Sequence, residues 1–159
     1  MAVTEKKMQL VTFQLGEEYY GINIMEVEGI VREDNIRAIP NAPAYVEGIF
    51  NLRGTIIPVI NLHKRFHLNR AQLSEEDKLL GGLITVKINS KLICVIIDKV
   101  SRVMTIDTTA IQPPPQILSG IGAEYIQGVV PQEGSYLIIL DINRLFDPKE
   151  LQQLGRFTQ

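Results

Sequence analysis

Two histidines lie close enough in the sequence to act on one ligand. His63 and His67 are four residues apart, and on a helix this spacing places two imidazoles on one face, where they could bind a metal ion. No third ligand follows nearby, and the basic residues Lys64 and Arg65 separate the pair. We therefore expect a solvated helix surface here and no metal site.

The remaining reactive side chains are poor candidates for catalysis. Glu75, Glu76 and Asp77 form a carboxylate cluster, but they stand in the polar segment 69–78, where a solvated loop is the simpler interpretation. Cys94 is the only cysteine and lies in the apolar run KLICVIID, so we expect a buried small side chain and no disulfide. The sequence also lacks a phosphate-binding glycine loop and a nucleophile elbow. It thus predicts a protein that is not an enzyme and needs no cofactor.

Arg53 has the most distinctive setting of the charged residues. It stands in the run Asn-Leu-Arg-Gly between two apolar segments, a pattern that predicts a turn between strands. A guanidinium group offers five donors in a planar fork, which can hold a loop through carbonyl or carboxylate oxygens or bind a partner. Arg53 is therefore the first candidate for an interaction site.

Composition and charge exclude several classes of function. The chain has 159 residues, of which 45% are hydrophobic and 21% charged, as in globular proteins. Its formal net charge is −2 and it has no tryptophan, so neither a basic field nor stacking aromatics predict binding to nucleic acid. No apolar run reaches the roughly 20 residues of a membrane-spanning helix, and the start lacks the apolar region of a signal peptide. We expect a cytoplasmic protein.

Alternating apolar residues predict the β-strands that position these side chains. In QLVTFQL, Val11, Phe13 and Leu15 share one face, and the alternation resumes after a Gly-Glu-Glu turn. The runs GGLITVKI and KLICVIID flank a short polar turn and predict a second hairpin. Their nearly unbroken apolar residues indicate strands that are covered on both sides.

The sequence contains an internal repeat. Segment 10–31 aligns without gaps on segment 83–104, and segment 45–66 aligns without gaps on segment 125–146. Pro-Gln-Glu-Gly replaces Asn-Leu-Arg-Gly in the second copy, so a glutamate takes the place of Arg53. Two aligned blocks in the same order are hard to obtain by chance and predict two copies of one unit.

The predicted architecture is mainly β, with one small barrel in each copy, because short strands avoid open edges by closing on themselves. We expect a first subdomain at about 8–68, a link at 69–78, a second subdomain at about 79–146 and a C-terminal helix at 147–155. Pro58 cannot donate a ladder hydrogen bond, so its strand should form an edge or a bulge there.

The run GIFNLRGTIIPVINL, preceded by YGINIMEVEGI and followed by GGLITVKINSKLICVIIDKVSRV, resembles the CheW family of bacterial chemotaxis over nearly the whole chain. The resemblance implies a single CheW-like domain over 1–159, built from two five-stranded SH3-like β-barrels related by a pseudo-twofold axis. It also implies a non-catalytic adapter that couples transmembrane chemoreceptors to the histidine kinase CheA in signalling arrays. The alternative is a divergent CheW-like scaffold that serves another two-component pathway with a non-flagellar output.

Two partners follow from the resemblance. In the family, one surface docks on the regulatory domain of CheA, which is itself built like CheW, and the cleft between the barrels receives the cytoplasmic tip of a methyl-accepting chemoreceptor. The protein is then expected to be recruited to membrane-associated arrays. By resemblance, the receptor-binding cleft contains Ile24, Val27, Gly29, Arg53 and Ile56. The turn itself is assigned to Asn51 and Gly54, and no residue marks the kinase-binding face.

One position departs from the family pattern. The arginine that matches Arg53 is usually paired with a glutamate in the family, whereas Gly29 stands in that place here, with Glu26 and Glu28 as the nearest carboxylates. Glu28 could reach Arg53 through a change of register, backbone oxygens could hold Arg53 as a structural clamp, or the receptor contact could be altered. For the apolar cleft residues, ordinary core burial remains an equal alternative.

Overall fold

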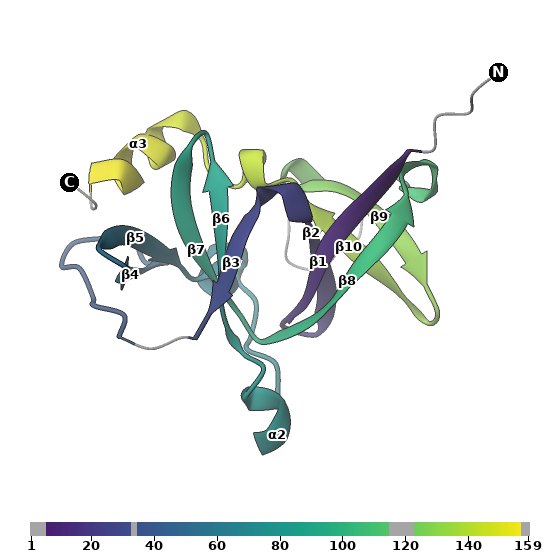
Figure 1. The fold of residues 1–159 in the computed structure, drawn as a ribbon, viewed down its shortest axis with the longest axis horizontal. Coiled ribbons are helices and arrows are strands. Elements are labelled where there is room, and N and C mark those ends of the chain that lie inside the picture. Colours follow the sequence, from purple (N-terminus) through teal and green to yellow (C-terminus); the bar gives the residue numbers. More distant parts are fainter. Residues whose placement is uncertain (1–5, 33–34, 115–122, 157–159) are drawn as a thin grey trace.

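The computed structural model describes residues 6–32, 35–114 and 123–156, and its ribbon is shown in Figure 1. Its main elements are ten strands: β1 (Lys7–Leu15), β2 (Glu18–Asn23), β3 (Val27–Val31), β4 (Val46–Leu52), β5 (Thr55–Ile60), β6 (Gly82–Ile88), β7 (Lys91–Ile97), β8 (Lys99–Asp107), β9 (Ile126–Gln132) and β10 (Ser135–Leu140). The helices are α1 (Leu62–Phe66), α2 (Glu75–Lys78) and α3 (Pro148–Arg156). Four short 3-10 helices connect these elements: η1 (Ile24–Glu26), η2 (Thr108–Ala110), η3 (Ala123–Tyr125) and η4 (Ile142–Arg144).

The repeat predicted from the sequence is visible in the strand order. One five-stranded sheet has the order β8-β1-β2-β10-β9, and the other has the order β3-β6-β7-β5-β4. In the repeat, β1, β2 and β3 correspond to β6, β7 and β8, and β4 and β5 correspond to β9 and β10. When each strand of the first sheet is replaced by its counterpart, the order of the second sheet results. The bounds of β9 and β10 also follow those of β4 and β5 at the spacing that the repeat predicts. The two sheets are therefore related by a pseudo-twofold axis.

The strand order corrects the expectation of one barrel in each half of the chain. β1 and β2 form their sheet with β8, β9 and β10 of the second copy, while β3, β4 and β5 of the first copy join β6 and β7. The predicted boundary near 69–78 therefore does not separate the two sheets. The chain changes sheets through η1 after β2 and through Asp98 after β7, so each copy contributes strands to both barrels.

Three apolar clusters hold this arrangement together. The largest lies between the sheets and includes Phe13, Tyr20 and Phe66. A second cluster around Leu10 fills the barrel of β8-β1-β2-β10-β9, and a third around Cys94 fills the other barrel. Cys94 is fully buried, which confirms the expected buried side chain, and this burial raises the pKa of its thiol. Because the central cluster contains residues from both sheets, the barrels share one core.

Pro58 marks a local difference between the two barrels. Its strand β5 pairs with β4 on one side, and with β7 on the other side only at Val59 and Ile60. The equivalent parallel ladder between β10 and β2 contains three residue pairs and begins at Leu137. Proline has no N–H to donate, so β5 behaves as an edge up to Pro58 and as an inner strand beyond it. This confirms the predicted edge. The first part of β5 and the start of β7 are therefore not paired with each other.

The C-terminal helix α3 begins as predicted. Asp147 caps it by accepting a hydrogen bond from the Glu150 backbone N–H at 2.8 Å, and the Glu150 carboxylate accepts one from the Asp147 N–H at 3.0 Å. This reciprocal pair is a capping box. Leu154 is buried and Leu151 packs on the central cluster, so α3 is held against the barrel of β3-β6-β7-β5-β4 (Figure 1).

Candidate protein-interaction site

The turn between β4 and β5 explains why the two copies of the repeat differ there. Arg53 and Gly54 both have positive φ angles, 54° and 89°, as a type I′ hairpin turn requires. The Asn51 side-chain oxygen accepts a hydrogen bond from the Gly54 N–H at 2.8 Å and stabilises this turn. The second copy has Pro131 in place of Asn51, and there only the glycine has a positive φ. The structure thus places Asn51 and Gly54 at the turn.

The turn presents Arg53 to solvent. Within the described residues, its guanidinium has no hydrogen bond or ion pair, and its side chain is exposed. Glu28 lies across the strand pair from Lys87, with 4.0 Å between their charged groups. Burial, together with the nearby Asp141, raises the pKa of Glu26. Neither carboxylate holds Arg53, and no backbone oxygen among the described residues does so, which leaves this side chain available to a partner.

The five residues expected in the receptor cleft fall into two groups. Ile24 and Val27 are partly buried against the central cluster, and Gly29 follows on β3, where a Cβ added to it would meet nothing within 4 Å. Arg53 lies in the hairpin turn, and Ile56, 42% exposed, follows on β5. The first group belongs to the segment η1–β3, and the second belongs to the β4–β5 hairpin.

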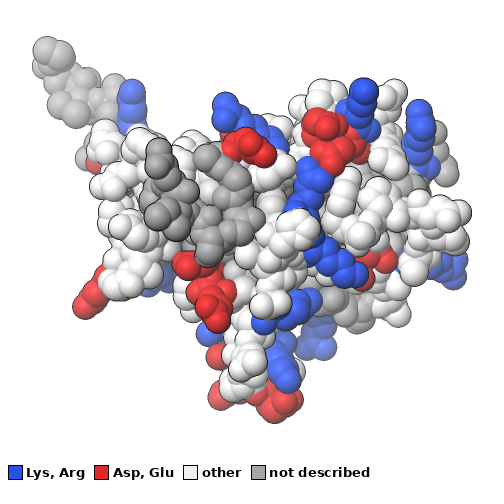
Figure 2. Space-filling view, turned by 180° about the vertical axis from the view of Figure 1, so that it is seen from behind, with Lys and Arg blue, Asp and Glu red and all other residues white. Residues whose placement is uncertain are grey.

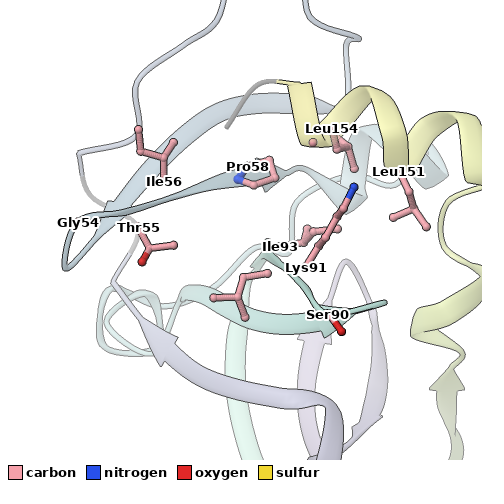
Figure 3. Close-up of a pocket in the computed structure, with 11 residues that line it drawn as sticks. Gly54, Thr55, Ile56, Pro58, Ser90, Lys91, Ile93, Leu151 and Leu154 are labelled. Carbon is pink, nitrogen blue, oxygen red and sulfur yellow. The ribbon is translucent and has the colours of Figure 1, made fainter. Parts of the chain in front are cut away.

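A cavity of about 590 Å³ lies where β5 and the start of β7 separate beneath α3. Figure 3 shows Ile56, Pro58 and Ile93 around it, with Leu151 and Leu154 reaching down from the helix. Lys91 extends across this space toward the helix, where its Nζ would lie 3.0 Å from a Cβ added at Gly155. The lining combines these apolar side chains with the polar residues Thr55, Ser90 and Lys91.

The structure adds three exposed apolar residues that the sequence interpretation missed. Ile30 on β3 is 47% exposed and Val103 on β8 is 53% exposed, while Met25 in η1 is 85% exposed. Ile30 and Val103 occupy equivalent positions of the repeat. β3 and β8 are edge strands and both face the viewer in Figure 1. The repeat alignment already showed that Ile30 and Val103 are equivalent, but it did not show that their side chains are exposed.

A buried polar network surrounds Asp98, which lies between β7 and β8. Asp98 accepts hydrogen bonds from His63 Nε2 at 2.8 Å and from the backbone N–H groups of Gly16 and Ala71 at 2.7 and 3.1 Å. Its other oxygen lies 2.8 Å from Arg70 Nε. Burial alone would raise the pKa of Asp98, but the hydrogen bonds from His63, Gly16 and Ala71 outweigh it and lower this pKa. The network ties the link between the two copies to both sheets.

This network corrects the expected solvated histidine pair. His63 is 3% exposed and bound to Asp98, because α1 turns it inward, whereas His67 ends α1 with a positive φ of 59°. In the described ranges, no group of three or more His, Cys, Asp or Glu side chains could hold a metal ion. In the carboxylate cluster 75–77, Glu75 and Glu76 are exposed as expected and Asp77 is half-buried, but the cluster forms the short helix α2 and not a loop.

A second charged cluster joins α3 to α1. Arg65 donates hydrogen bonds to both Glu150 oxygens at 2.6 and 2.8 Å and to the Leu145 carbonyl at 2.8 Å. Its guanidinium carbon lies 4.8 Å from the centre of the Tyr45 ring. Burial alone would raise the pKa of Glu150, but Arg65 together with the hydrogen bonds from the Asp147 N–H and the Tyr45 hydroxyl outweighs it and lowers this pKa. The pair is a structural anchor, since both side chains are largely enclosed.

Charges on the molecule are mixed. On the face opposite to that of Figure 1, basic and acidic side chains alternate over the middle, while an acidic side chain projects at the left end and basic side chains gather at the right (Figure 2). In the part of the chain that the structure describes, no helix has the length and apolar character needed to cross a membrane.

Comparisons with known proteins agree with this architecture. The family model for the CheW-like domain matches residues 9–150. The chain is 57% identical over 155 residues to the chemotaxis protein CheW of Treponema pallidum (strain Nichols), covering 98% of this chain and 91% of that protein. It is 28% identical over 148 residues to the chemotaxis protein CheW of Rhizobium meliloti (strain 1021), covering 93% of both.

A solved structure shows the same fold. The crystal structure of the scaffolding protein TtCheW from Thermoanaerobacter tengcongensis superimposes with a TM-score of 0.78 at 36% sequence identity, and the match covers 88% of each chain. The similarity extends over both sheets, because it includes most of the chain.

Proposed function

Since the chain belongs to the CheW family and is thus a non-catalytic scaffolding protein of chemotaxis signalling, we propose that it couples chemoreceptors to the histidine kinase CheA. In this proposal it forms one contact with the regulatory domain of CheA and another with the cytoplasmic tip of a methyl-accepting receptor. These contacts would recruit it to receptor arrays at the membrane.

The observation that carries the receptor contact is the pair Ile30 and Val103. Both side chains are about half exposed, although they are apolar and lie at equivalent positions on the edge strands β3 and β8. Exposed apolar residues that gather on one face mark an interaction surface. A receptor tip is a helical hairpin, and helices bind such surfaces through an apolar stripe. We assign the receptor contact to this face, with Ile24, Val27 and Gly29 along the same segment.

Gly29 fits this assignment on steric grounds. The space above it is open, so a partner backbone can approach β3 closely at this position. The usual family glutamate would occupy that space with a charged side chain. In this chain the contact is therefore more apolar than in relatives that retain the glutamate, and Arg53 is released from a pairing role.

Titration calorimetry with two partners tests the proposal. The chain is titrated with a CheA regulatory domain and, separately, with a soluble receptor cytoplasmic fragment from the same organism. We expect saturable binding to both, and at least about tenfold weaker receptor binding for the double variant Ile30→Asp/Val103→Asp, because it places charges in an apolar contact. Leu79→Asp on α2 is the matched control, since Leu79 is 78% exposed and lies on another element.

The possible outcomes test the assigned receptor-binding face and the coupling function separately. Equal loss of receptor binding in the Leu79 variant would contradict the assigned face. No binding of the unmodified chain to either partner at the highest soluble concentration would contradict the coupling role itself. Circular dichroism of each variant shows whether the fold is retained.

A further inference from the structure

Met25 is the most exposed large apolar side chain in the part of the chain that the structure describes. It is 85% exposed, compared with 47% for Ile30 and 53% for Val103. None of the three residues of η1 is buried, and the Met25 N–H donates a hydrogen bond to the Asn23 side-chain oxygen at 3.0 Å. The backbone is thus held here without the Met25 side chain, and the fold gains little from its thioether.

The repeat provides a comparison for this position. Met25 aligns with Asp98, because segment 10–31 corresponds to segment 83–104, and both residues lie where the chain passes from one sheet to the other. Asp98 is 3% exposed and forms the centre of a polar network, whereas Met25 extends into solvent. The crossing at η1 therefore keeps an apolar side chain that does not pack within the chain.

Met25 belongs to the segment assigned to the receptor contact. η1 leads directly into β3, which carries Gly29 and Ile30. Ile24 and Val27, which are close to Met25 in the sequence, pack on the central cluster, so Met25 lies on the outward side of this segment. Methionine is unbranched and polarisable and adapts to surfaces of different shape, as on proteins that bind several partners. A receptor tip bound to this segment would contact the Met25 thioether.

A thioether is also a side chain that mild oxidants attack. Methionine sulfoxide is polar, and reductases convert it back to the thioether. Met8 and Met104 are only partly exposed and pack against the cluster around Leu10, while Met1 lies outside the described residues. Among the methionines that the structure describes, Met25 therefore offers an oxidant the most accessible sulfur.

We propose that Met25 is a site of reversible oxidation, at which hydrogen peroxide weakens the receptor contact. One oxygen of the peroxide forms a bond to the sulfur as the O–O bond breaks, and the other oxygen leaves as water with both protons. The sulfur loses two electrons and the peroxide gains them. A methionine sulfoxide reductase reverses the change with two thiols, which become a disulfide while the sulfoxide oxygen leaves as water. This inference rests on the proposed coupling function.

Oxidation of Met25 should change receptor binding without changing the fold. In the free protein the sulfoxide oxygen stays in water, because this side chain is exposed. In the complex the same oxygen loses its water within an apolar contact, where an unpaired polar group is unfavourable. We expect receptor binding to become about tenfold weaker.

Peptide mapping after a short exposure of the purified chain to hydrogen peroxide tests the site. Cleavage after glutamate places the four methionines in four different peptides, so mass spectrometry measures the oxidation of each one separately. We expect Met25 to react at least about tenfold faster than Met8 and Met104, because oxidation follows exposure of the sulfur.

Titration calorimetry with the soluble receptor cytoplasmic fragment tests the effect on binding. The peroxide is removed before the titration, so that only the chain is oxidised. Treatment with methionine sulfoxide reductases and dithiothreitol should restore the affinity. Met25→Leu removes the sulfur at nearly constant volume, and its affinity after peroxide treatment should equal its own affinity before treatment. Met25→Gln has a permanently polar end and should bind about as weakly as the oxidised chain.

The inference is overturned if Met25 reacts no faster than Met8 and Met104, or if complete oxidation of Met25 leaves receptor affinity unchanged. It is also overturned if peroxide weakens receptor binding of Met25→Leu as much as that of the unmodified chain. Binding of the CheA regulatory domain should not change on oxidation, and its loss would overturn the inference because it would indicate damage to the fold. An untreated chain that does not bind the receptor fragment would overturn the coupling function as well, whereas unchanged binding after oxidation would overturn this inference alone.

Discussion

Replacing Asp98 by asparagine should be the most destabilising polar substitution in the described core. The carboxylate accepts from His63, Gly16 and Ala71 and pairs with Arg70, while its side chain is only 1% exposed. The asparagine amide can replace one acceptor oxygen, but its NH₂ group faces donors. Breaking a buried charged network costs about 3–5 kcal/mol, and we take the lower end because Arg70 is half exposed.

The loss should be visible in thermal and urea unfolding at pH 7. About 3 kcal/mol corresponds to a fall in Tm of about 6–12 °C for a domain of this size. Asp77→Asn is the matched control, since Asp77 lies 3.5 Å from Lys99 at the surface and should change stability by no more than about 0.5 kcal/mol. A cost below about 1 kcal/mol for Asp98→Asn would refute the network as a source of stability.

The same variant gives a second, independent readout in its pH dependence. The pKa of Asp98 is lowered from 3.8 in the folded protein, so its contribution is fully present above that ordinary value and is lost as pH falls through the folded pKa. The difference in unfolding free energy between the unmodified chain and Asp98→Asn should therefore shrink toward acid pH. If this difference stays constant between about pH 7 and pH 3, the charge of the Asp98 carboxylate does not contribute to the stability of the folded protein.

Two further substitutions test the anchor and the turn. Glu150→Gln removes the charge that pairs with Arg65, and we expect a loss of about 2 kcal/mol, with faster hydrogen exchange in α3 than in the sheets; exchange that is unchanged in α3 would contradict the anchoring role. Asn51→Ala removes the acceptor for the Gly54 N–H and should cost about 1 kcal/mol in urea unfolding, whereas Gln132→Ala in the other hairpin should be nearly neutral. Equal effects of these two alanines would argue against a special role for Asn51.

The sequence predicted the strands and their repetition well, but not how they pair. Alternation in the segment around Phe13 located β1 and β2, and the spacing of the repeat located β9 and β10 from β4 and β5. Pairing within a copy and pairing between copies bury the same residues, so composition cannot distinguish them. The three residues of η1, which carry the chain from one sheet to the other, have no sequence signal of that role.

The candidate site was predictable in part. The turn at Asn51–Gly54 has recognisable chemistry, and the structure places Arg53 there with an exposed side chain. The exposure of Ile30 and Val103 was not predictable, because edge strands and inner strands have similar apolar patterns. The burial of His63 was also missed, since its partner Asp98 lies far along the chain and meets it only in the folded protein.

The exchange of strands between the copies also orders events during synthesis of the chain. The sheet β3-β6-β7-β5-β4 is complete in sequence once Ile97 has left the ribosome, but the sheet that contains β1 and β2 needs β10, which ends at Leu140. The first two strands to emerge, β1 and β2, are therefore among the last to acquire all their neighbours. Their apolar faces stay uncovered while most of the chain is synthesised. A chaperone that protects this N-terminal hairpin would act at the stage where aggregation is most dangerous for this fold.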